Sequence, residues 1–357
     1  MFVDNGIIHV TIQPEIGAEC SASEPKLEGM MIADGRGAHE SRPLSGEDRA
    51  SVVAEAARAL RDGYVYPEVG DAMARDLETK LRSGEYDNVE DESSLAGRLT
   101  SDCRVVSNDR HLDLHVAPAE SSAEANHHGP SIDEMRAENY AFRKVEILPG
   151  NIGYLKFDAF VDTDEAKATG AAAMAFLRYC DALIVDLRSN GGGSPEMIQF
   201  LTSYLFEERV HLNDMVDRYG QVVQEYWTLG EVPGERLRNY VPVFVLTSSR
   251  TFSGAEEFAY NLKNENRATL VGETTGGGAH LGRVERLGDR FIMSLPHLRA
   301  QNPISHGNWE GTGVEPDVNV PASEALEKAE ALARDAIANP GSANREGSGS
   351  RRPAGAL

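Results

Sequence analysis

The sequence has few cysteines and no long apolar run, and each scarcity excludes a class of protein. Three cysteines in 357 residues, with no C-x-x-C spacing, provide neither a disulfide framework nor a zinc-binding pattern. No apolar stretch is long enough to span a bilayer, so no membrane partner is expected. The first residues lack the basic and apolar regions of a signal peptide. We therefore expect a cytoplasmic protein with reduced thiols, without a cofactor and without a structural metal.

Basic residues are also scarce relative to acidic ones. The chain has 35 lysines and arginines against 57 aspartates and glutamates, which gives a formal net charge of -22. Such a charge disfavours nucleic acid as a partner. The hydrophobic content of 41% is that of an ordinary globular chain with a sizeable core. Whether the protein forms a homo-oligomer is left open by the sequence.

Changes in composition divide the chain into five regions. Apolar residues at helical spacing follow Ser45, a predicted helix N-cap, and indicate three helices that form a cap. A polar segment with the pair His127-His128 separates this cap from the rest, and two loop histidines without a third ligand do not indicate a metal. The predicted regions are a loosely ordered leader (1–44), the cap (45–118), a linker (119–138), a core (139–338) and a disordered tail (339–357).

Three segments of the core share one pattern, in which a buried strand runs into a polar or glycine-rich turn. The turns contain Gly191-Gly192-Gly193, Ser253-Gly254 and Gly276-Gly277-Gly278. In a parallel sheet the carboxyl ends of neighbouring strands meet at one edge, so these turns are expected to lie side by side. The segment 219–240, which contains a Pro-Gly turn, is expected either to cover the sheet, which we favour, or to line a substrate groove. The alternation of strands and helices predicts an α/β core.

Ser253 lies where a predicted strand gives way to a predicted helix. The strand is 241–246, and the helix carries Ala255, Phe258, Ala259 and Leu262 on one face. At such a junction a hydroxyl can project beside unpaired backbone N–H groups, which suits a nucleophile. The alternative is a simple N-cap, with Glu256 completing a capping box.

Four motifs, within a stretch from about Ser51 to about Ala329, resemble the C-terminal-processing (tail-specific) serine peptidase family. They are D-L-R-x-N-x-G-G (186–193), T-S-x-x-T-x-S-x-A-E-E-F-A-Y (247–260), R-A-T-x-V-G-E-x-T-x-G-G-A-H (267–280) and G-V-x-P-D-V (313–318). The likeness is greatest to the branch of the tricorn core and of the repeats of interphotoreceptor retinoid-binding protein (IRBP). The resemblance implies a ββα core of the crotonase and Clp-protease type with an N-terminal three-helix cap. The chain leaves no space for the PDZ domain that many relatives insert.

The resemblance also implies the residues of an acyl-transfer site. Ser253 is the nucleophile, His111 the general base, and Glu310 the carboxylate that orients His111. The other branch of the family places a lysine twenty-five residues after the serine, where this chain has Gly278. Glu256, which the lysine branch pairs with its serine, is expected to support the site or cap the helix. His280 and His306 are alternative bases on other loops.

An acyl-transfer site also needs backbone donors for the developing oxyanion. The N–H of Gly254 is one candidate, and the turn Gly191-Gly192 supplies the other, because glycine lets the backbone approach a substrate closely.

The function expected from these residues is a serine-type peptidase whose partner is a peptide or protein substrate. One alternative is a carrier of an apolar ligand, as the retinoid-binding relatives are. Another is an esterase or acyl transferase that acts on small molecules. Retention of serine, histidine and acid together favours catalysis, because a carrier does not need them.

Overall fold

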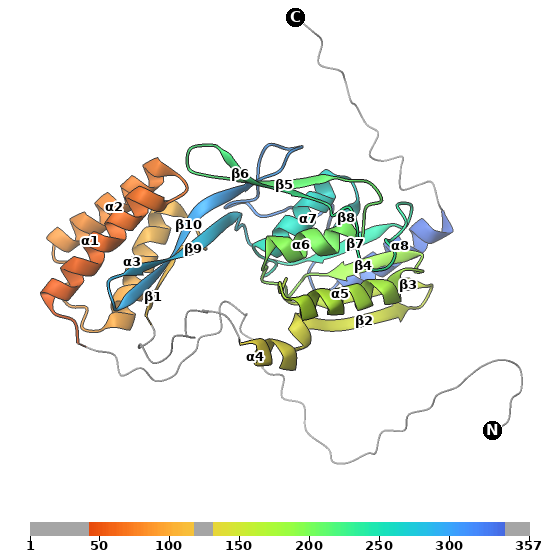
Figure 1. The fold of residues 1–357 in the computed structure, drawn as a ribbon, viewed down its shortest axis with the longest axis horizontal. Coiled ribbons are helices and arrows are strands. Elements are labelled where there is room, and N and C mark those ends of the chain that lie inside the picture. Colours follow the sequence, from red (N-terminus) through yellow and green to blue (C-terminus); the bar gives the residue numbers. More distant parts are fainter. Residues whose placement is uncertain (1–42, 118–130, 340–357) are drawn as a thin grey trace, which may run out of the picture.

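The computed structural model describes residues 43–117 and 131–339, which form a helical cap and an α/β core (Figure 1). Nearly all of the predicted tail and of the predicted leader lie outside these residues, as does most of the predicted linker. Among the described residues, no helix combines the length and the apolar character that crossing a membrane requires.

The helices are α1 (Gly46–Gly63), α2 (Pro67–Arg82), α3 (Glu92–Ser107), α4 (Ile132–Ala137), α5 (Asp164–Leu177), α6 (Pro195–Ser203), α7 (Gly254–Asn264) and α8 (Ala325–Ala338), with a 3-10 turn at Asn139–Ala141. The strands are β1 (Asp113–Val116), β2 (Phe142–Leu148), β3 (Ile152–Phe157), β4 (Ala182–Asp186), β5 (His211–Val216), β6 (Val222–Trp227), β7 (Val243–Thr247), β8 (Ala268–Gly272), β9 (His280–Leu287), β10 (Phe291–Gln301) and β11 (Val318–Asn319).

The cap consists of α1, α2 and α3, as the helical spacing predicted. Helix α1 begins at the predicted N-cap, where the Ser45 hydroxyl accepts the N–H of Asp48 and the Asp48 carboxylate accepts the N–H of Ser45. Helix α2 begins with Pro67, whose missing N–H costs nothing in the first turn. The apolar faces of the three helices enclose a cluster in which Leu60, Leu77 and Leu99 are fully buried.

The core is built on a six-stranded sheet with the order β11-β8-β7-β4-β3-β2. Strands β3, β4, β7, β8 and β11 run parallel, and β2 pairs antiparallel with β3. Because β4, β7 and β8 are parallel neighbours, the three turns that follow them lie at the same edge of the sheet. This arrangement confirms the predicted α/β core.

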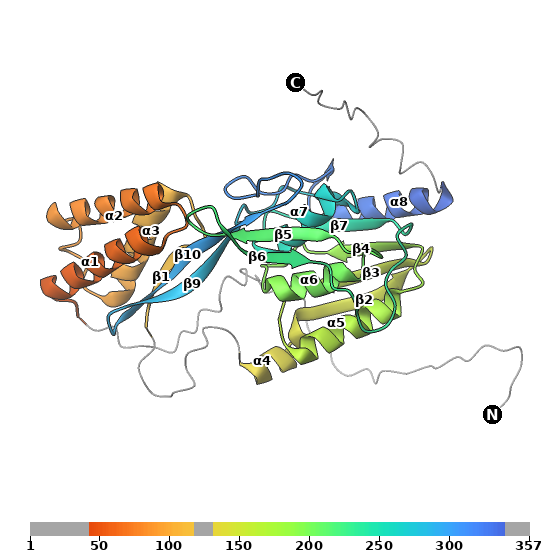
Figure 2. The same ribbon diagram turned by 45° about the horizontal axis from the view of Figure 1, so that its top comes forward.

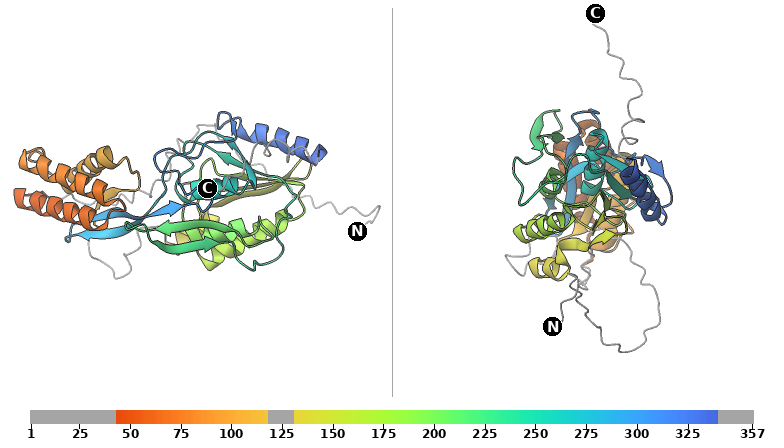
Figure 3. Two further views of the ribbon diagram at one scale, coloured as in Figure 1. Left: turned by 90° about the horizontal axis from the view of Figure 1, so that it is seen from above. Right: turned by 90° about the vertical axis from the view of Figure 1, so that its right-hand side faces the viewer.

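Helices cover both faces of this sheet. Successive residues of β4 point to opposite faces, so Leu183 and Val185 pack with α5, α6 and α7, whereas Ile184 packs with α8. Figure 3 shows α8 on one side of the sheet and α5 on the other. All five residues of β4 are buried, as expected for a strand covered on both faces.

An antiparallel sheet connects the cap to the core. Its order is β1-β10-β5-β6, and β9 also pairs with β10. Strand β10 belongs to both apolar clusters, because Phe291 and Met293 pack in the cap whereas Ala300 packs in the core. Figure 2 shows β9 and β10 as an arm between the two parts. A register shift between Pro296 and Leu298 interrupts the β9–β10 ladder within this arm.

Four elements of the structure, α4, β5, β6 and β9, were not predicted from the sequence. Helix α4 lies inside the predicted linker, where Ser131 and Glu134 form a capping box. The segment 219–240 contains strand β6, which pairs with the equally unpredicted β5. Strand β9 was not predicted either. Strand β1 begins at Asp113, and His111 lies in the turn before it.

Candidate active site

Ser253 lies at the carboxyl end of β7, in the turn immediately before α7. Its backbone has φ 54° and ψ -124°, a conformation that is rare for a residue with a side chain. Its Oγ is 2.9 Å from Nε2 of His111. The preceding residues are fixed by buried contacts, because the Thr251 hydroxyl donates to the carbonyl of Leu187 in 2.8 Å. The serine is thus held on a rigid turn and directed at an imidazole.

His111 reaches Ser253 from the cap, on a short turn between α3 and β1. The turn is clamped by Arg104 of α3, whose guanidinium donates to the carbonyls of Arg110 and Leu112, one on each side of His111. The N–H of His111 donates to Oδ1 of Asp109 in 2.9 Å. The two reacting groups therefore come from different parts of the molecule.

The other ring nitrogen of His111, Nδ1, is buried and has no hydrogen-bond partner among the described residues. The carboxylate of Asp109 lies 3.9 Å away. Both oxygens of Asp109 are already engaged, since Oδ1 accepts the N–H of His111 and Oδ2 lies 2.9 Å from the Tyr64 hydroxyl and 2.7 Å from Nδ1 of His280. Asp109 thus ties together the end of α1, the His111 turn and the start of β9, a connection that the sequence did not reveal.

Glu310 lies beside this cluster but is not hydrogen-bonded to His111. Its Oε2 accepts the N–H of Ala279 in 2.6 Å and lies 3.6 Å from Nδ1 of His280. Its Oε1 is buried without a partner, as is Nδ1 of His111. The hydrogen bond that the sequence prediction requires between Glu310 and His111 is absent, although a buried donor and a buried acceptor are available to form it.

Burial governs the protonation of the site. Burial lowers the pKa of His111 to about 4, and Asp109 only partly opposes this effect. Burial raises the pKa of Glu310 to about 7, in part against the influence of His280. Burial alone would raise the pKa of Asp109, but its contacts with His280 and His111 hold that pKa below its usual value. At neutral pH His111 is uncharged and able to accept a proton.

Glu256 is fully buried and organises the backbone around the serine. Its carboxylate accepts the N–H groups of Ser253 at 2.8 Å, Gly277 at 2.7 Å and Gly278 at 2.8 Å, and the Thr275 hydroxyl at 2.5 Å. Burial raises its pKa, and these four hydrogen bonds counter the rise. Glu256 joins the start of α7 to the glycine turn after β8, and it does not contact His111.

The backbone donors near Ser253 differ from those the sequence suggested. The N–H of Gly191 is bonded to the carbonyl of Asp158, and the N–H of Gly192 to the side chain of Asn190. Among the described residues, the N–H groups of Gly193 and Gly254 have no hydrogen-bond acceptor. A Cβ on Gly254 would lie 3.1 Å from the nitrogen of Gly193, so these two groups are close neighbours.

The positions of the other histidines and of the nearby acidic groups bear on the choice of base and on metal binding. His280 is buried against Asp109, and His306 lies on an exposed loop, so within the described ranges only the His111 ring hydrogen-bonds to Ser253. Asp109, His111 and Glu310 each offer one ligand atom, and these atoms lie within 4.8 Å of one another. Because Nε2 of His111 faces Ser253, this cluster fits acid–base chemistry better than metal binding.

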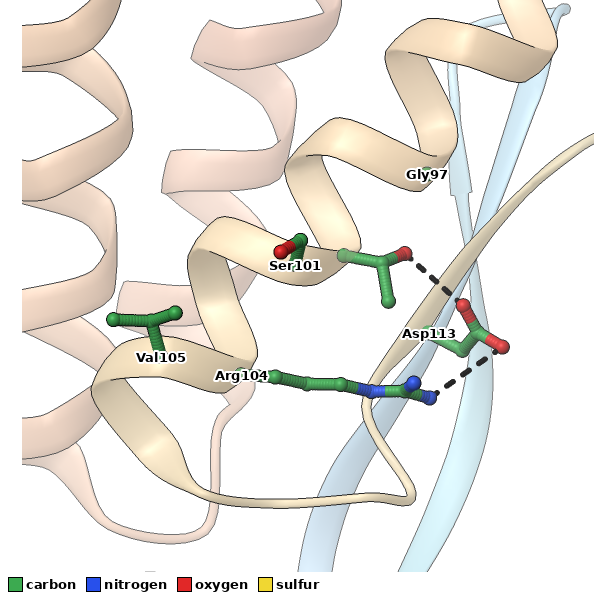
Figure 4. Close-up of a pocket in the computed structure, with 6 residues that line it drawn as sticks. Gly97, Ser101, Arg104, Val105 and Asp113 are labelled. Atoms are coloured by element: carbon green, nitrogen blue, oxygen red, sulfur yellow. Dashed lines mark hydrogen bonds and ion pairs between the residues drawn. The ribbon is translucent and has the colours of Figure 1, made fainter.

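A hollow on the cap lies behind the His111 turn (Figure 4). It is lined by Gly97, Thr100, Ser101, Arg104, Val105 and Asp113. Its polar groups are paired with one another, because Asp113 accepts the Thr100 hydroxyl at 3.0 Å and lies 3.6 Å from the Arg104 guanidinium. Neither Ser253 nor His111 is among the residues that line this hollow.

The chain is similar in sequence and in fold to known processing proteases. The chain is 31% identical over 185 residues to carboxyl-terminal-processing peptidase 2, chloroplastic, from Arabidopsis thaliana, over 49% of this chain and 34% of that protein. Among solved structures it resembles a photosystem II D1 C-terminal processing protease, with a TM-score of 0.52 and 16% identity, over 82% of this chain and 97% of the other. It also resembles the tricorn protease, with a TM-score of 0.52 and 13% identity, over 84% of this chain and 38% of the other.

The chain spans about a third of the length of the Arabidopsis relative, so that protein's name does not by itself define the activity here. Two family models match consecutive parts of the chain. The N-terminal domain of peptidase family S41 in eukaryotic IRBP matches residues 47–147, which include His111. Peptidase family S41 matches residues 151–320, which include Ser253 and Glu310. The two matches cover both the cap and the core, and this chain belongs to peptidase family S41.

Proposed function

We propose that this protein is a serine-type peptidase that cleaves peptide bonds through Ser253, His111 and Glu310. The single observation that carries the proposal is the 2.9 Å contact between the Ser253 hydroxyl and a neutral His111 ring. A serine hydroxyl becomes nucleophilic when a base within hydrogen-bond reach accepts its proton. The lowered pKa of His111 keeps that base unprotonated at neutral pH.

In the proposed reaction, Oγ of Ser253 attacks the carbonyl carbon of the scissile peptide while Nε2 of His111 takes the hydroxyl proton. The imidazolium so formed donates from Nδ1, and the unpartnered Oε1 of Glu310 is the acceptor available to it. The protonated His111 then gives its proton to the leaving amine, and water releases the acyl group by the same steps in reverse. The catalytic carboxylate thus pairs with the base only when the base is charged.

The proposed oxyanion site is formed by the N–H groups of Gly193 and Gly254. Both donors are free, and both lie next to the nucleophile. This assignment keeps the predicted Gly254 and replaces Gly191 and Gly192, whose N–H groups are occupied. Glu256 contributes indirectly by fixing the backbone of Ser253. Loss of one such oxyanion donor typically slows turnover about 100- to 1000-fold.

A fluorophosphonate probe tests this proposal directly. The full-length protein is expected to be labelled at Ser253, as read by peptide mass spectrometry, and Ser253→Ala and His111→Ala are expected to abolish labelling. Ser305→Ala is the matched control. The hydroxyl of Ser305, a loop residue, hydrogen-bonds to Tyr260 of α7 and not to His111. An unlabelled wild type that copurifies with a lipid in native mass spectrometry would instead support the carrier alternative.

We also propose that the protein is located in the cytoplasm. Cys103 and Cys180 are free, buried thiols, which supports a reducing compartment such as the cytoplasm. The remaining cysteine, Cys20, lies outside the described residues.

A further inference from the structure

On the side of the His111 ring that faces away from Ser253, no hydrogen bond to a described residue fixes the ring's orientation. Its Nδ1 is unpartnered, and the nearest carboxylate oxygen of Asp109 is 3.9 Å away. A ring fixed only by its bond to Ser253 would be free to rotate about χ1 and χ2. Its aim at the serine must therefore come from packing.

Phe252, the residue before the nucleophile, packs on the face of this ring. The centroids of the Phe252 and His111 rings are 4.8 Å apart, with the planes inclined by 27°. The guanidinium of Arg110 also lies over the Phe252 ring, 4.7 Å from its centroid. The backbone of Phe252 is fixed, because its N–H donates to the carbonyl of Asn190 in 3.1 Å. One short segment thus carries both the nucleophile and a packing surface for the base.

Gly278 is packed against both rings. A Cβ at this position would lie 2.4 Å and 2.5 Å from two carbons of the Phe252 ring and 2.6 Å from Cε1 of His111. The backbone here cannot retreat, since the N–H of Gly278 donates to Glu256 and its carbonyl accepts the Trp309 indole N–H in 2.7 Å. Any side chain at position 278 would displace one of the two rings.

We propose that Phe252 and Gly278 form a slot that fixes the plane of the His111 ring and thereby aims Nε2 at Ser253. Both are positioning residues, because neither needs to touch the substrate or the reacting atoms. The slot makes a glycine at position 278 a requirement for a histidine base, so a lysine at that position and His111 in its present place exclude each other. This inference rests on the proposed peptidase function, but its geometry can be tested separately.

Gly278→Ala and Phe252→Leu are the two test variants in the full-length protein. Misplacement of a catalytic group by about 1 Å costs roughly 100-fold, so we expect Gly278→Ala to slow fluorophosphonate labelling of Ser253 by about that factor. Phe252→Leu, which leaves the ring unsupported, is expected to lose about tenfold. Leucine also vacates the space that the new methyl group needs, so the double variant should label faster than the product of the two single losses predicts.

Matched controls separate this role from general packing. Gly97→Ala adds a methyl group where nothing lies within 4 Å, and Phe200→Leu trims a buried ring that lies in the main core. Both should label at the wild-type rate once thermal unfolding shows that they are folded. A second readout is independent of activity. In a Ser253→Ala background, histidine NMR should show the His111 pKa moving from about 4 toward its usual value when Phe252→Leu opens the ring to water.

The outcomes are distinguishable. If the wild-type protein is not labelled, the proposed function fails. The NMR titration of His111 then still shows whether Phe252 and Gly278 fix its ring. If wild type is labelled, and Gly278→Ala and Phe252→Leu both react at its rate with an unchanged His111 pKa, the slot is overturned. Slow labelling with a shifted pKa in folded variants supports it.

Discussion

At the scale of single residues, two carboxylates compete for the role of partner to His111. Asp109 is nearer, but its oxygens already bind the His111 N–H, Tyr64 and His280. Glu310 has a buried oxygen with no hydrogen-bond partner among the described residues. Burial raises the pKa of Glu310 to about 7, so a small change in its surroundings at neutral pH changes its charge. Asp109 is therefore suited to hold the backbone in place, and Glu310 to meet a charged imidazole.

Substituting the two acids separates these roles. Glu310→Gln keeps an acceptor for the Ala279 N–H but no longer provides a negative charge, so we expect labelling of Ser253 to fall roughly 100- to 10000-fold with little change in Tm. Asp109→Asn leaves buried donors unsatisfied and should reduce the free energy of unfolding by roughly 1–3 kcal/mol, with a smaller loss of labelling. An Asp109→Asn variant that is inert at unchanged Tm, beside an active Glu310→Gln, would transfer the orienting role to Asp109.

The sequence predicted some of these residues better than others. Ser253 stands in a motif of the core, and the family resemblance implied His111 as its base, so the two residues were expected together. The free donor at Gly193 was not predictable, because which glycine N–H remains unpaired depends on Asn190 accepting from Gly192 and on Asp158 accepting from Gly191. Which acceptors lie near each glycine depends on the backbone conformation, and a run of three glycines does not indicate that conformation.

At the scale of elements, helix α7 combines the two interpretations that the sequence left open at Ser253. The Glu256 carboxylate accepts the Ser253 N–H, as a capping residue would, while the serine hydroxyl is directed at His111. The positive φ of Ser253 turns its side chain out of the helical path. The backbone N–H of Ser253 thus takes part in capping, while its side chain is left free for the proposed nucleophilic role.

The next residue of α7, Glu257, is a second buried carboxyl and provides a test of packing between α7 and β5. Burial raises its pKa to about 8, although Asn213 of β5 and Asn261 lie beside it and counter part of the rise. An acid whose folded pKa exceeds its unfolded value near 4.5 stabilises the fold most at low pH. That contribution is progressively lost as pH rises from about 4.5 to about 8.

Glu257→Gln removes this pH dependence while preserving shape. We expect the variant to become more stable relative to wild type as pH is raised from about 5 to about 9, as measured by urea unfolding at each pH. Glu265→Gln is the control, because that side chain is at the end of the same helix and less buried, and only a small change is expected. Parallel stability curves for wild type and Glu257→Gln would show that Glu257 is ionised in the folded protein.

Two of the strands that the sequence missed, β6 and β9, share a physical cause. Strand β6 is largely exposed at the edge of its sheet, so Val222 and Val223 face water and give no regular alternation. Strand β9 pairs only with β10 and has few buried residues, since Leu287 and His280 lie at its two ends. Buried strands such as β4 and β7 were predictable because both of their faces are apolar. Edge strands depend on a partner that the local sequence does not specify.

At the scale of the whole molecule, the hydrogen bond between Ser253 and His111 joins two parts that each have their own apolar cluster. His111 belongs to the cap, Ser253 to the core, and the arm of β9 and β10 joins them (Figure 2). The register shift at Pro296 and Leu298 weakens the ladder in this arm. The distance between Ser253 and His111 therefore depends on contacts that hold the cap against the core.

Arg218 makes such a contact at a distance from the site. It lies in the loop between β5 and β6, and its guanidinium donates to the carbonyl of Arg61 in α1 over 2.7 Å. A hydrogen bond from a charged donor contributes about 1.5–3 kcal/mol, and 1.4 kcal/mol corresponds to a tenfold change in an equilibrium. We expect Arg218→Ala to lower the labelling rate of Ser253 by about tenfold, because the cap is positioned for reaction less of the time.

Hydrogen exchange identifies the cause of that loss. In Arg218→Ala, exchange should increase at the end of α1 and in the His111 turn, while the buried strand β4 stays protected. Arg236→Ala is the matched control, since its guanidinium also donates to carbonyls, those of Phe206 and Leu229, but all within the core. It should leave the labelling rate near that of wild type. Equal labelling of wild type and Arg218→Ala would contradict this expectation. It would mean that strands β9 and β10 hold the cap in position by themselves, despite the register shift at Pro296.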